Sequence, residues 1–322
     1  MKKRFGTALR ITISLALLAF LIYRSRSNFG SILDGIKDLN IYYLSIAFLF
    51  YFIAISFIVF RWGILLKAYN HHISGLFLWQ SALIGFFYNN LLPSSVGGDF
   101  YRVYDIKQNK NVPVKEGTAT VVIERTIGTL TSLTMLIIAY FLGLFKYLSK
   151  NAALGLLISI LILVLIFVAI FFPRLFKLNL LLNKFRIFAR IRPGLKEFHG
   201  ILISYRHKIN YLLISYLFSL IIQVFFIISF SSIALALGLE LKFYIFIFVL
   251  PFIALVAIIP ITVGGIGIRE NALVFSITLF GIAQSKATLF SIIVLAIILT
   301  IGMIGGIIYL IKNIFYKSKS FI

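Results

Sequence analysis

Long apolar runs separated by short polar segments dominate the chain. Runs long enough to cross a bilayer as helices lie at about 5–23, 41–60, 117–143, 152–172, 210–236 and 287–311. A membrane-spanning α-helix needs about 20 predominantly apolar residues, and each run comes close to or exceeds that length. The pattern therefore predicts an all-α polytopic integral membrane protein with about six spanning helices.

Two further apolar runs, at about 73–92 and 243–259, each end in one copy of a repeated phrase. The phrase is P-x-x-V-G-G-x-x-x-R, and it occupies 93–102 and 260–269. Proline removes a helical hydrogen bond and paired glycines allow backbone geometries closed to other residues. At membrane depth, such irregular backbone is tolerated where it lines a cavity. We therefore expect two re-entrant helical hairpins, whose loop geometry depends on Pro93, Gly97, Gly98, Pro260, Gly264, Gly265 and Gly267.

The basic residues lie mainly between the apolar runs, and their distribution predicts the orientation. With the N-terminus inside, the segments 1–10, 61–72, 99–116, 173–209 and 312–322 hold 22 of the 31 Lys and Arg residues. The opposite segments, 24–40, 144–151, 237–242 and 284–286, hold 7. Because cytoplasmic loops carry the excess of Lys and Arg, both termini are expected in the cytoplasm. The expected location is the cell (inner or cytoplasmic) membrane.

This topology places the two hairpins on opposite faces of the membrane. Three predicted spans, an odd number, separate them, so the two similar units form an inverted repeat, the arrangement that transporters use for alternating access. An alternative is that 243–259 and 270–283 are two complete spans, which gives up to eight spans in total. Since the arms have only 17 and 14 residues, the re-entrant interpretation is preferred.

The chain shows no linker or low-complexity region that would divide it, so 1–322 is expected to form a single membrane domain. The run at 5–23 is interpreted as a retained anchor helix, because no small-residue cleavage site follows it. The basic segment 173–209 is expected on the cytoplasmic side. Its residues 178–190 fit either an amphipathic helix at the headgroup level or an ordinary solvated loop.

Composition narrows the function classes. Apolar residues make up 61% of the chain and charged residues 12%, so the net charge of +22 reflects membrane orientation and attraction to anionic lipid. Nucleic acid is not expected as a partner. Cysteine is absent, and the sequence holds no Walker loop, GxSxG, HExxH or histidine pair with metal-ligand spacing. No catalytic residue, metal site or cofactor is therefore assigned.

Ionisable residues inside apolar segments are the strongest candidates for function, since they are costly in a membrane unless paired or solvated. Glu124 is followed by Arg125, and Glu270 is preceded by Arg269. On the helix that carries Glu124, the residues Thr120, Gly128 and Thr131 share its face, while further hydroxyl residues form the adjoining arc. Two interpretations remain: a buried ion-pair network that fixes helix packing, or a water-accessible cavity that contacts a charged substrate.

The repeated phrase supplies one arginine in each copy, at Arg102 and Arg269. The planar guanidinium suits phosphate, so an anionic headgroup is the simplest ligand for these loops. The first copy has more polar groups, because Asn89-Asn90 precede it and Asp99 follows Gly98. Asp99 fits two roles, proton acceptor or partner of Arg102. The predicted headgroup-binding or translocation residues are Asn90, Asp99, Arg102, Glu124, Arg125, Arg269 and Glu270.

Three segments together resemble the lysylphosphatidylglycerol synthase transmembrane family, the flippase-like membrane half of multiple peptide resistance factors, which also occurs as free-standing proteins. They are N-N-L-L-P-S-S-V-G-G-D-F-Y-R at 89–102, E-R-x-x-G at 124–128 and P-x-x-V-G-G-x-G-x-R-E at 260–270. The resemblance covers essentially the whole chain. It implies a lipid translocase fold, with aminoacylated phosphatidylglycerol or polyprenyl-phosphate-linked sugars as candidate cargo. Only 312–322 follow the last apolar run, so lysyltransferase activity is not expected.

The preferred hypothesis is a flippase that moves a phospholipid or polyprenyl-phosphate-linked lipid with a polar, charged headgroup between leaflets, in a role in lipid transport and the cell envelope. The alternatives are an integral-membrane transferase of lipid or envelope biosynthesis and an accessory subunit of such an enzyme. Whether the chain is an enzyme is left open, with a non-enzymatic protein preferred. The expected partners are an anionic or aminoacylated membrane lipid and a separate lipid-modifying transferase, and homo-oligomerisation is left open.

Overall fold

The computed structural model describes residues 29–92, 97–171, 208–258 and 265–319, together with single residues or short pieces within 12–23 and at 200, 201, 204, 205 and 262. Across these ranges every regular element is a helix, which confirms the all-α polytopic class. Four helices are long and apolar enough to cross a membrane: α3 (Ile41–Lys67), α6 (Val114–Phe141), α10 (Ile209–Ala236) and α13 (Gln284–Lys319). The short α2 (Phe29–Lys37) precedes them.

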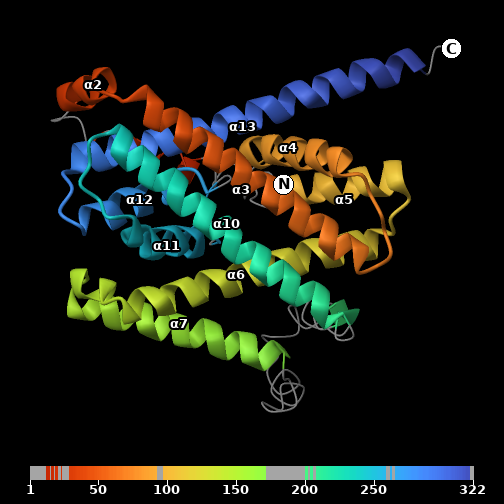
Figure 1. Ribbon diagram of the computed structural model, residues 1–322, viewed down its shortest axis with the longest axis horizontal. Helices are drawn as coiled ribbons and strands as arrows, with labels where there is room; N and C mark the ends of the chain where they lie inside the picture. The colour runs from red at the N-terminus through yellow and green to blue at the C-terminus, as the bar shows by residue number, and fades with distance from the viewer. Residues whose placement is uncertain are drawn as a thin grey trace.

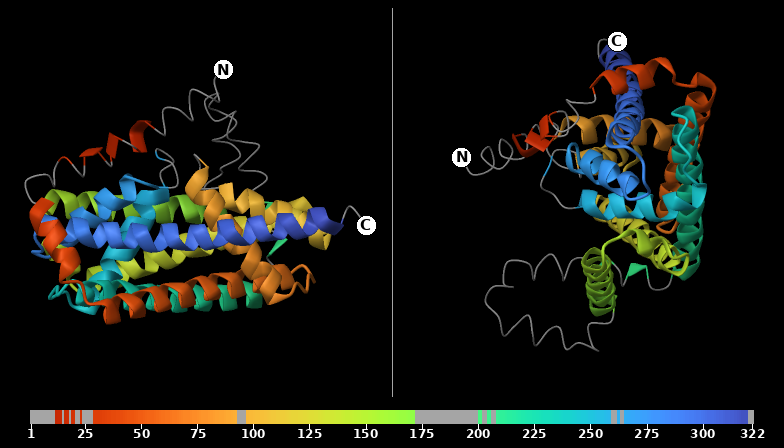
Figure 2. Two further views of the ribbon diagram at one scale, coloured as in Figure 1. Left: turned by 90° about the horizontal axis from the view of Figure 1, so that it is seen from above. Right: turned by 90° about the vertical axis from the view of Figure 1, so that its left-hand side faces the viewer.

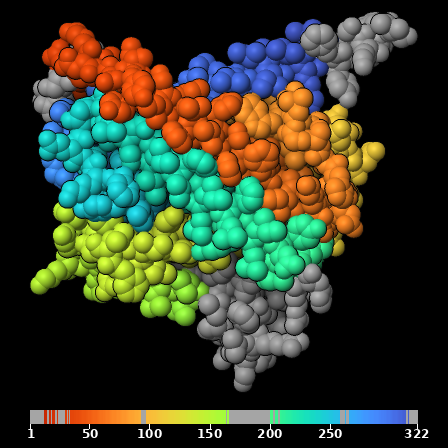
Figure 3. Space-filling model, in the orientation of Figure 1, coloured from red at the N-terminus to blue at the C-terminus, as the bar shows by residue number. Residues whose placement is uncertain are grey.

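Helices α3 and α10 form an antiparallel pair along one side of the bundle (Figures 1 and 3). At one end the backbone N–H of Asn40 donates to the carbonyl of Ala236 at 3.0 Å. At the other end the Tyr205 hydroxyl donates to the carbonyl of Leu65 at 3.2 Å. Between these ends, the Ser229 hydroxyl reaches the carbonyl of Ala47 at 2.7 Å, a close contact that small residues allow between membrane helices.

Helix α7 (Lys150–Phe171) lies at the edge of the bundle, joined to α6 by the 3₁₀ turn η2 (Leu144–Tyr147). The end-on view of Figure 2 shows it set apart from the other long helices. The leucine, isoleucine and valine residues of α7 lie on all faces of the helix, and most of its described side chains are exposed. A helix that is apolar all round and unburied by protein suits contact with lipid.

Two helical hairpins complete the bundle. The first consists of α4 (Gly75–Leu91) and α5 (Gly97–Lys110), and the second of α11 (Phe246–Ile258) and α12 (Ile268–Thr278), with η4 (Phe243–Ile245) leading into α11. At about 1.5 Å per residue, their arms measure roughly 26, 21, 20 and 17 Å. Since the hydrocarbon core is about 30 Å thick, these lengths favour re-entrant hairpins over complete spans. The tip residues 93–96 and most of 259–264 lie outside the described ranges.

The two hairpins enter the bundle from opposite ends, as the inverted-repeat prediction requires (Figure 1). The open end of the first is tied to α13 by the Lys312–Asp105 ion pair at 2.8 Å. The open end of the second lies by η2, where the rings of Tyr147 and Phe280 are 4.8 Å apart. Each hairpin also packs against the spanning helix that follows the other hairpin in sequence. Helix α4 of the first hairpin packs against α13, which follows the second, and α11 of the second packs against α6, which follows the first.

Glycines permit the close contact between α4 and α13. A Cβ atom at Gly305 would collide with the carbonyl oxygen of Leu83, and one at Gly306 would lie 2.8 Å from the ring of Phe87. Within the first hairpin, a Cβ at Gly98 would collide with the carbonyl oxygen of Gly85. The Gly97-Gly98 pair thus allows α5 to approach the backbone of α4, besides breaking the helix.

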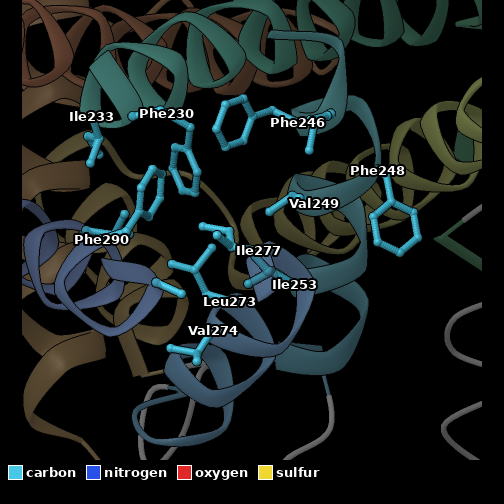
Figure 4. Close-up of a cluster of buried hydrophobic side chains, with 14 of the residues drawn as sticks. Phe230, Ile233, Phe246, Phe248, Val249, Ile253, Leu273, Val274, Ile277 and Phe290 are labelled. Carbon is cyan, nitrogen blue, oxygen red and sulfur yellow. The ribbon is translucent and has the colours of Figure 1, made fainter. Parts of the chain in front are cut away.

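A cluster of large apolar side chains holds the second hairpin in place. Figure 4 shows Phe246 and Val249 of α11 and Leu273 of α12 converging with Phe230 of α10 and Phe290 of α13. The rings of Phe246 and Phe290 stack with centroids 6.0 Å apart. Through this cluster the hairpin is anchored to two spanning helices.

The sequence-based boundaries need correction at two places. The first predicted span after the N-terminal run ends near 60, but α3 continues to Lys67, which places Arg61 inside the helix. The segment from 99 was assigned to a cytoplasmic loop, yet α5 covers it as far as Lys110 and buries Arg102. Hydropathy ends an apolar run at an arginine because it cannot register a partner elsewhere in the chain. The predicted span 5–23 and segment 178–190 lie largely or wholly outside the described residues.

Candidate functional site

Glu124 of α6 binds arginines from two other helices in the interior of the bundle. Its Oε1 accepts a hydrogen bond from Arg61 Nη2 of α3 at 3.0 Å, and its Oε2 accepts one from Arg102 Nη2 of α5 at 2.7 Å. The Glu124 side chain is 7% exposed and each arginine 10%. Charge-assisted hydrogen bonds of this kind are the strong ones in proteins, so Glu124 ties the first hairpin to α3 and α6.

A second carboxylate, Asp99, extends the cluster along α5. Its Oδ2 accepts from Arg125 Nε at 2.6 Å, and its Oδ1 lies 3.5 Å from Arg102 Nη1. Arg102 thus bridges Asp99 and Glu124. The Arg125 side chain is 47% exposed, so the cluster runs from the interior toward an open surface. Of the two roles open to Asp99, the structure supports pairing with arginine.

Neighbouring side chains orient the arginines. The guanidinium carbon of Arg102 lies 4.0 Å from the centre of the Trp62 ring, a cation–π contact. The Trp62 indole N–H donates to the Thr120 hydroxyl at 3.2 Å, and that hydroxyl donates to the carbonyl of Gly117 at 2.8 Å. Arg61 Nη1 donates to the Ser219 hydroxyl of α10 at 2.6 Å. Four helices therefore contribute to the position of two guanidinium groups.

A cavity of about 250 Å³ adjoins these charges. Its lining comes from α3, α4, α5 and α6: Ile58, Arg61, Ala82, Gly85, Phe86, Asn89, Asp99, Arg102, Val121, Glu124, Arg125 and Gly128. With both carboxylates ionised, three guanidinium groups face two negative charges. In addition, the Nε atoms of Arg61 and Arg102 are buried without a hydrogen-bond partner among the described residues. The lining therefore suits a small anionic group.

The second copy of the repeated phrase is arranged differently. Arg269 binds the adjacent Glu270, with Nη2 2.7 Å and Nε 3.0 Å from Oε1. The other oxygen of Glu270 accepts the backbone N–H of Gly267 at 2.6 Å and caps the start of α12. Gly265 and Gly267 have φ of +81° and +89°, which favour glycine. Among the described contacts, Arg269 belongs to this local cap and does not reach Glu124.

The remaining predicted residues divide between packing and capping. Asn90 Nδ2 donates to the carbonyl of Ile298 at 3.4 Å, which places Asn90 at the contact with α13 and away from the cavity lining. Its neighbour Asn89 lines the cavity and accepts the backbone N–H of Gly98 at 2.8 Å. Pro93, Pro260 and Gly264 lie outside the described residues, and Gly97 begins α5.

Three contributors were missed or undervalued in the sequence. In the sequence-based prediction, Arg61 and Trp62 fall in the cytoplasmic segment 61–72, and Ser219 has no site role. The available signal was an Arg-Trp pair followed, after Gly63, by the apolar residues 64–66, which indicates that the helix continues past Arg61. Within the described part of the chain, no three His, Asp or Glu side chains are grouped as a metal site would require.

A helical bundle with two broken hairpins and a charged cavity in its interior defines a class: polytopic membrane proteins with a polar intramembrane site. The chain belongs to the lysylphosphatidylglycerol synthase TM region family, whose model matches residues 7–306. It is also similar to two proteins described as UPF0104 membrane proteins. One, from Methanocaldococcus jannaschii, is 30% identical over 149 residues, which is 44% of this chain and 43% of the relative.

The second relative, from Methanothermobacter thermautotrophicus, is 23% identical over 285 residues, or 80% of this chain and 81% of the relative. The chain thus spans less than half of the first relative and most of the second. No solved structure matches this chain. Membership of the family, together with the apolar helices, establishes an integral membrane protein.

Proposed function

We propose that this protein translocates a lipid with a phosphate-bearing headgroup between the leaflets of the cell membrane, with the headgroup passing through the central cavity. The observation that carries the proposal is the surplus of positive charge: three arginines and two carboxylates line one cavity. Among the described lining residues the cations outnumber the anions, and a phosphate entering the cavity would offset this difference. The guanidinium groups offer the planar donors that phosphate oxygens accept.

A purely structural ion-pair network is the simplest competing explanation. Such a network favours balanced charges and close packing around every member. Here the charges are unequal, Arg125 is half-exposed, and a Cβ at Gly128 would meet no atom within 4 Å. Open space beside a cationic cluster favours a binding cavity over a packing device.

The transferase alternative has less support at this site. A carboxylate that acts as a general base must be able to receive a proton. The carboxylate oxygens of Glu124 and Asp99 already accept hydrogen bonds from arginines, so neither carboxylate is placed to take a proton from a substrate. The accessory-subunit alternative makes no use of the cavity.

Translocation can be measured in proteoliposomes that contain phosphatidylglycerol labelled with a fluorophore on its headgroup. An impermeant quencher added outside reports the fraction of label that reaches the outer leaflet. We expect Arg102→Gln and Glu124→Gln each to slow translocation about tenfold or more, the size expected for losing a charge-assisted hydrogen bond. The exposed Lys37→Gln and Glu240→Gln serve as charge-matched controls and should match the wild type.

Equal rates for the wild type, Arg102→Gln and protein-free vesicles would refute the proposal. Appearance of a chemically modified lipid in the same vesicles, supplied with a candidate donor, would favour a transferase instead. Circular dichroism and gel filtration of each variant show whether a slow rate reflects misfolding.

A further inference from the structure

A second cavity, of about 700 Å³, lies outside the central charge cluster. It is formed by α4, α5 and α13 and is lined by Tyr88, Leu92, Gly97, Phe100, Tyr101, Tyr104, Asp105, Gln108, Asn109, Tyr309 and Lys312. Tyr101, Tyr104, Asp105 and Gln108 follow the i, i+3, i+4, i+7 spacing of one helix face, whereas Asp99 and Arg102 lie on another. Its volume falls within the roughly 300–1,000 Å³ of small-molecule sites.

Three tyrosines form an aromatic wall of this cavity. The rings of Tyr88 and Tyr101 stack with centroids 5.0 Å apart, and Tyr309 lies edge-on to them at 5.7 and 6.3 Å. Tyrosines are also common at the membrane–water interface, where their rings lie at the level of the headgroups. Here each ring contacts the other two, and together they present a partly buried surface to a cavity.

An ion pair between Asp105 and Lys312, which carries no net charge, completes the lining of the cavity. Asp105 Oδ1 accepts from Lys312 Nζ at 2.8 Å and from Asn109 Nδ2 at 2.8 Å. The Asp105 side chain is only 4% exposed, and its Oδ2 has no hydrogen-bond partner among the described residues. The ammonium of Lys312 is further held 4.9 Å from the centre of the Phe77 ring. A buried acceptor without a donor is costly, so a hydroxyl-bearing ligand would stabilise this wall.

The tyrosine rings and the Asp105–Lys312 ion pair together indicate which class of ligand fits the cavity. An amine would add a second cation beside Lys312, and a bare phosphate would meet the Asp105 carboxylate and the negative faces of the tyrosine rings. A sugar satisfies both walls, because its C–H faces stack on aromatic rings while its hydroxyls bond to carboxylate, amide and ammonium groups. At the mouth, Phe100 is 73% exposed and Tyr104 58% exposed, which leaves an apolar route for acyl chains.

We propose that the cavity between α4, α5 and α13 binds the sugar of a glycosylated lipid headgroup. This inference rests on the proposed translocation and specifies its cargo as a lipid whose headgroup carries a sugar. The first hairpin then separates two sites, with phosphate chemistry on the Arg102 face of α5 and sugar chemistry on the Tyr101 face.

Binding can be tested without transport. The purified chain is placed in phosphatidylcholine nanodiscs that contain equal small fractions of glucosyl-diacylglycerol, diacylglycerol and phosphatidylethanolamine, and retained lipids are identified by native mass spectrometry. We expect the glucosyl lipid to be retained over both others. Tyr101→Leu and Gln108→Ala should lower its occupancy about tenfold, the effect of losing roughly 1.4 kcal/mol of binding free energy. Tyr147→Leu, at the opposite end of the bundle, is the matched control and should retain it.

Equal retention of diacylglycerol and its glucosyl derivative would overturn the sugar site, as would preferential retention of phosphatidylethanolamine. Because Gln108 is exposed, Gln108→Ala tests the site even if Tyr101→Leu disturbs folding; unchanged occupancy in a folded Gln108→Ala protein would count against the proposal. A wild-type chain that retains the glucosyl lipid and fails to translocate any lipid would support the sugar site while refuting the proposed function.

Discussion

At the scale of single residues, Glu124 is the carboxylate that binds two buried arginines in the interior of this protein. It joins Arg61 and Arg102, which are 41 positions apart in sequence and belong to different helices. Removing one partner of a buried ion pair costs about 3–5 kcal/mol, because the other charge is left uncompensated. Loss of activity in variants of Glu124 therefore combines a binding effect with a folding effect, and a variant that separates them is more informative.

Gly128→Ala provides that separation. Gly128 lies one helical turn after Glu124 in the cavity lining, and a Cβ there would meet no atom within 4 Å. Alanine should preserve or raise helix stability, by up to about 1 kcal/mol, since glycine is the poorer helix former. It should also narrow the cavity, so we expect slower headgroup translocation with an unchanged or higher unfolding temperature. Unchanged translocation in this variant would place the transport path elsewhere.

At the scale of helices, the packing of the first hairpin against α13 depends on glycine. In α13, Gly305 faces the backbone of α4 so closely that any Cβ collides with the carbonyl of Leu83. Gly305→Ala must push α4 and α13 apart, and we expect a loss of about 1–3 kcal/mol, the usual cost of overpacking. Gly155→Ala on the lipid-facing α7, where a Cβ meets nothing within 4 Å, is the control and should be neutral or stabilising. Thermal unfolding in detergent compares the two; equal melting temperatures would contradict the close packing.

How far the sequence predicts these elements depends on whether the signal is local. The long apolar runs predict α3, α6, α10 and α13, and the repeated phrase with its glycines predicts both hairpins, because length and helix breaking act within one segment. Arg61 was assigned to a loop for the same reason: only the carboxylate of Glu124, distant in sequence, makes a buried arginine stable. Arg102 and Arg269 both end a copy of the same phrase, yet Arg102 binds Glu124 of another helix and Arg269 binds the adjacent Glu270. This difference depends on neighbours in the fold, which the phrase itself does not contain.

At the scale of the whole molecule, most basic residues fall in the sequence segments that are predicted to be cytoplasmic. Once Arg61 and Arg102 are assigned to the interior, the predicted cytoplasmic segments retain 20 Lys and Arg residues against 7 in the opposite segments. The charge asymmetry therefore persists after the correction. In Figure 1 the open end of the first hairpin and the C-terminal end of α13 share one end of the molecule, and η2 and the start of α13 share the other.

The absence of cysteine makes this orientation directly measurable, because single cysteines can be introduced without any background. We place one at Lys37, Lys150 or Glu240, at one end, and one at Lys67 or Lys110, at the other; all five positions are exposed. Since the excess of Lys and Arg marks the cytoplasmic side, a membrane-impermeant maleimide applied to intact cells should label only the first three. After permeabilisation, all five should react. Labelling of Lys67→Cys and Lys110→Cys in intact cells, with protection of the others, would reverse the orientation and place the Tyr101 cavity on the outer face.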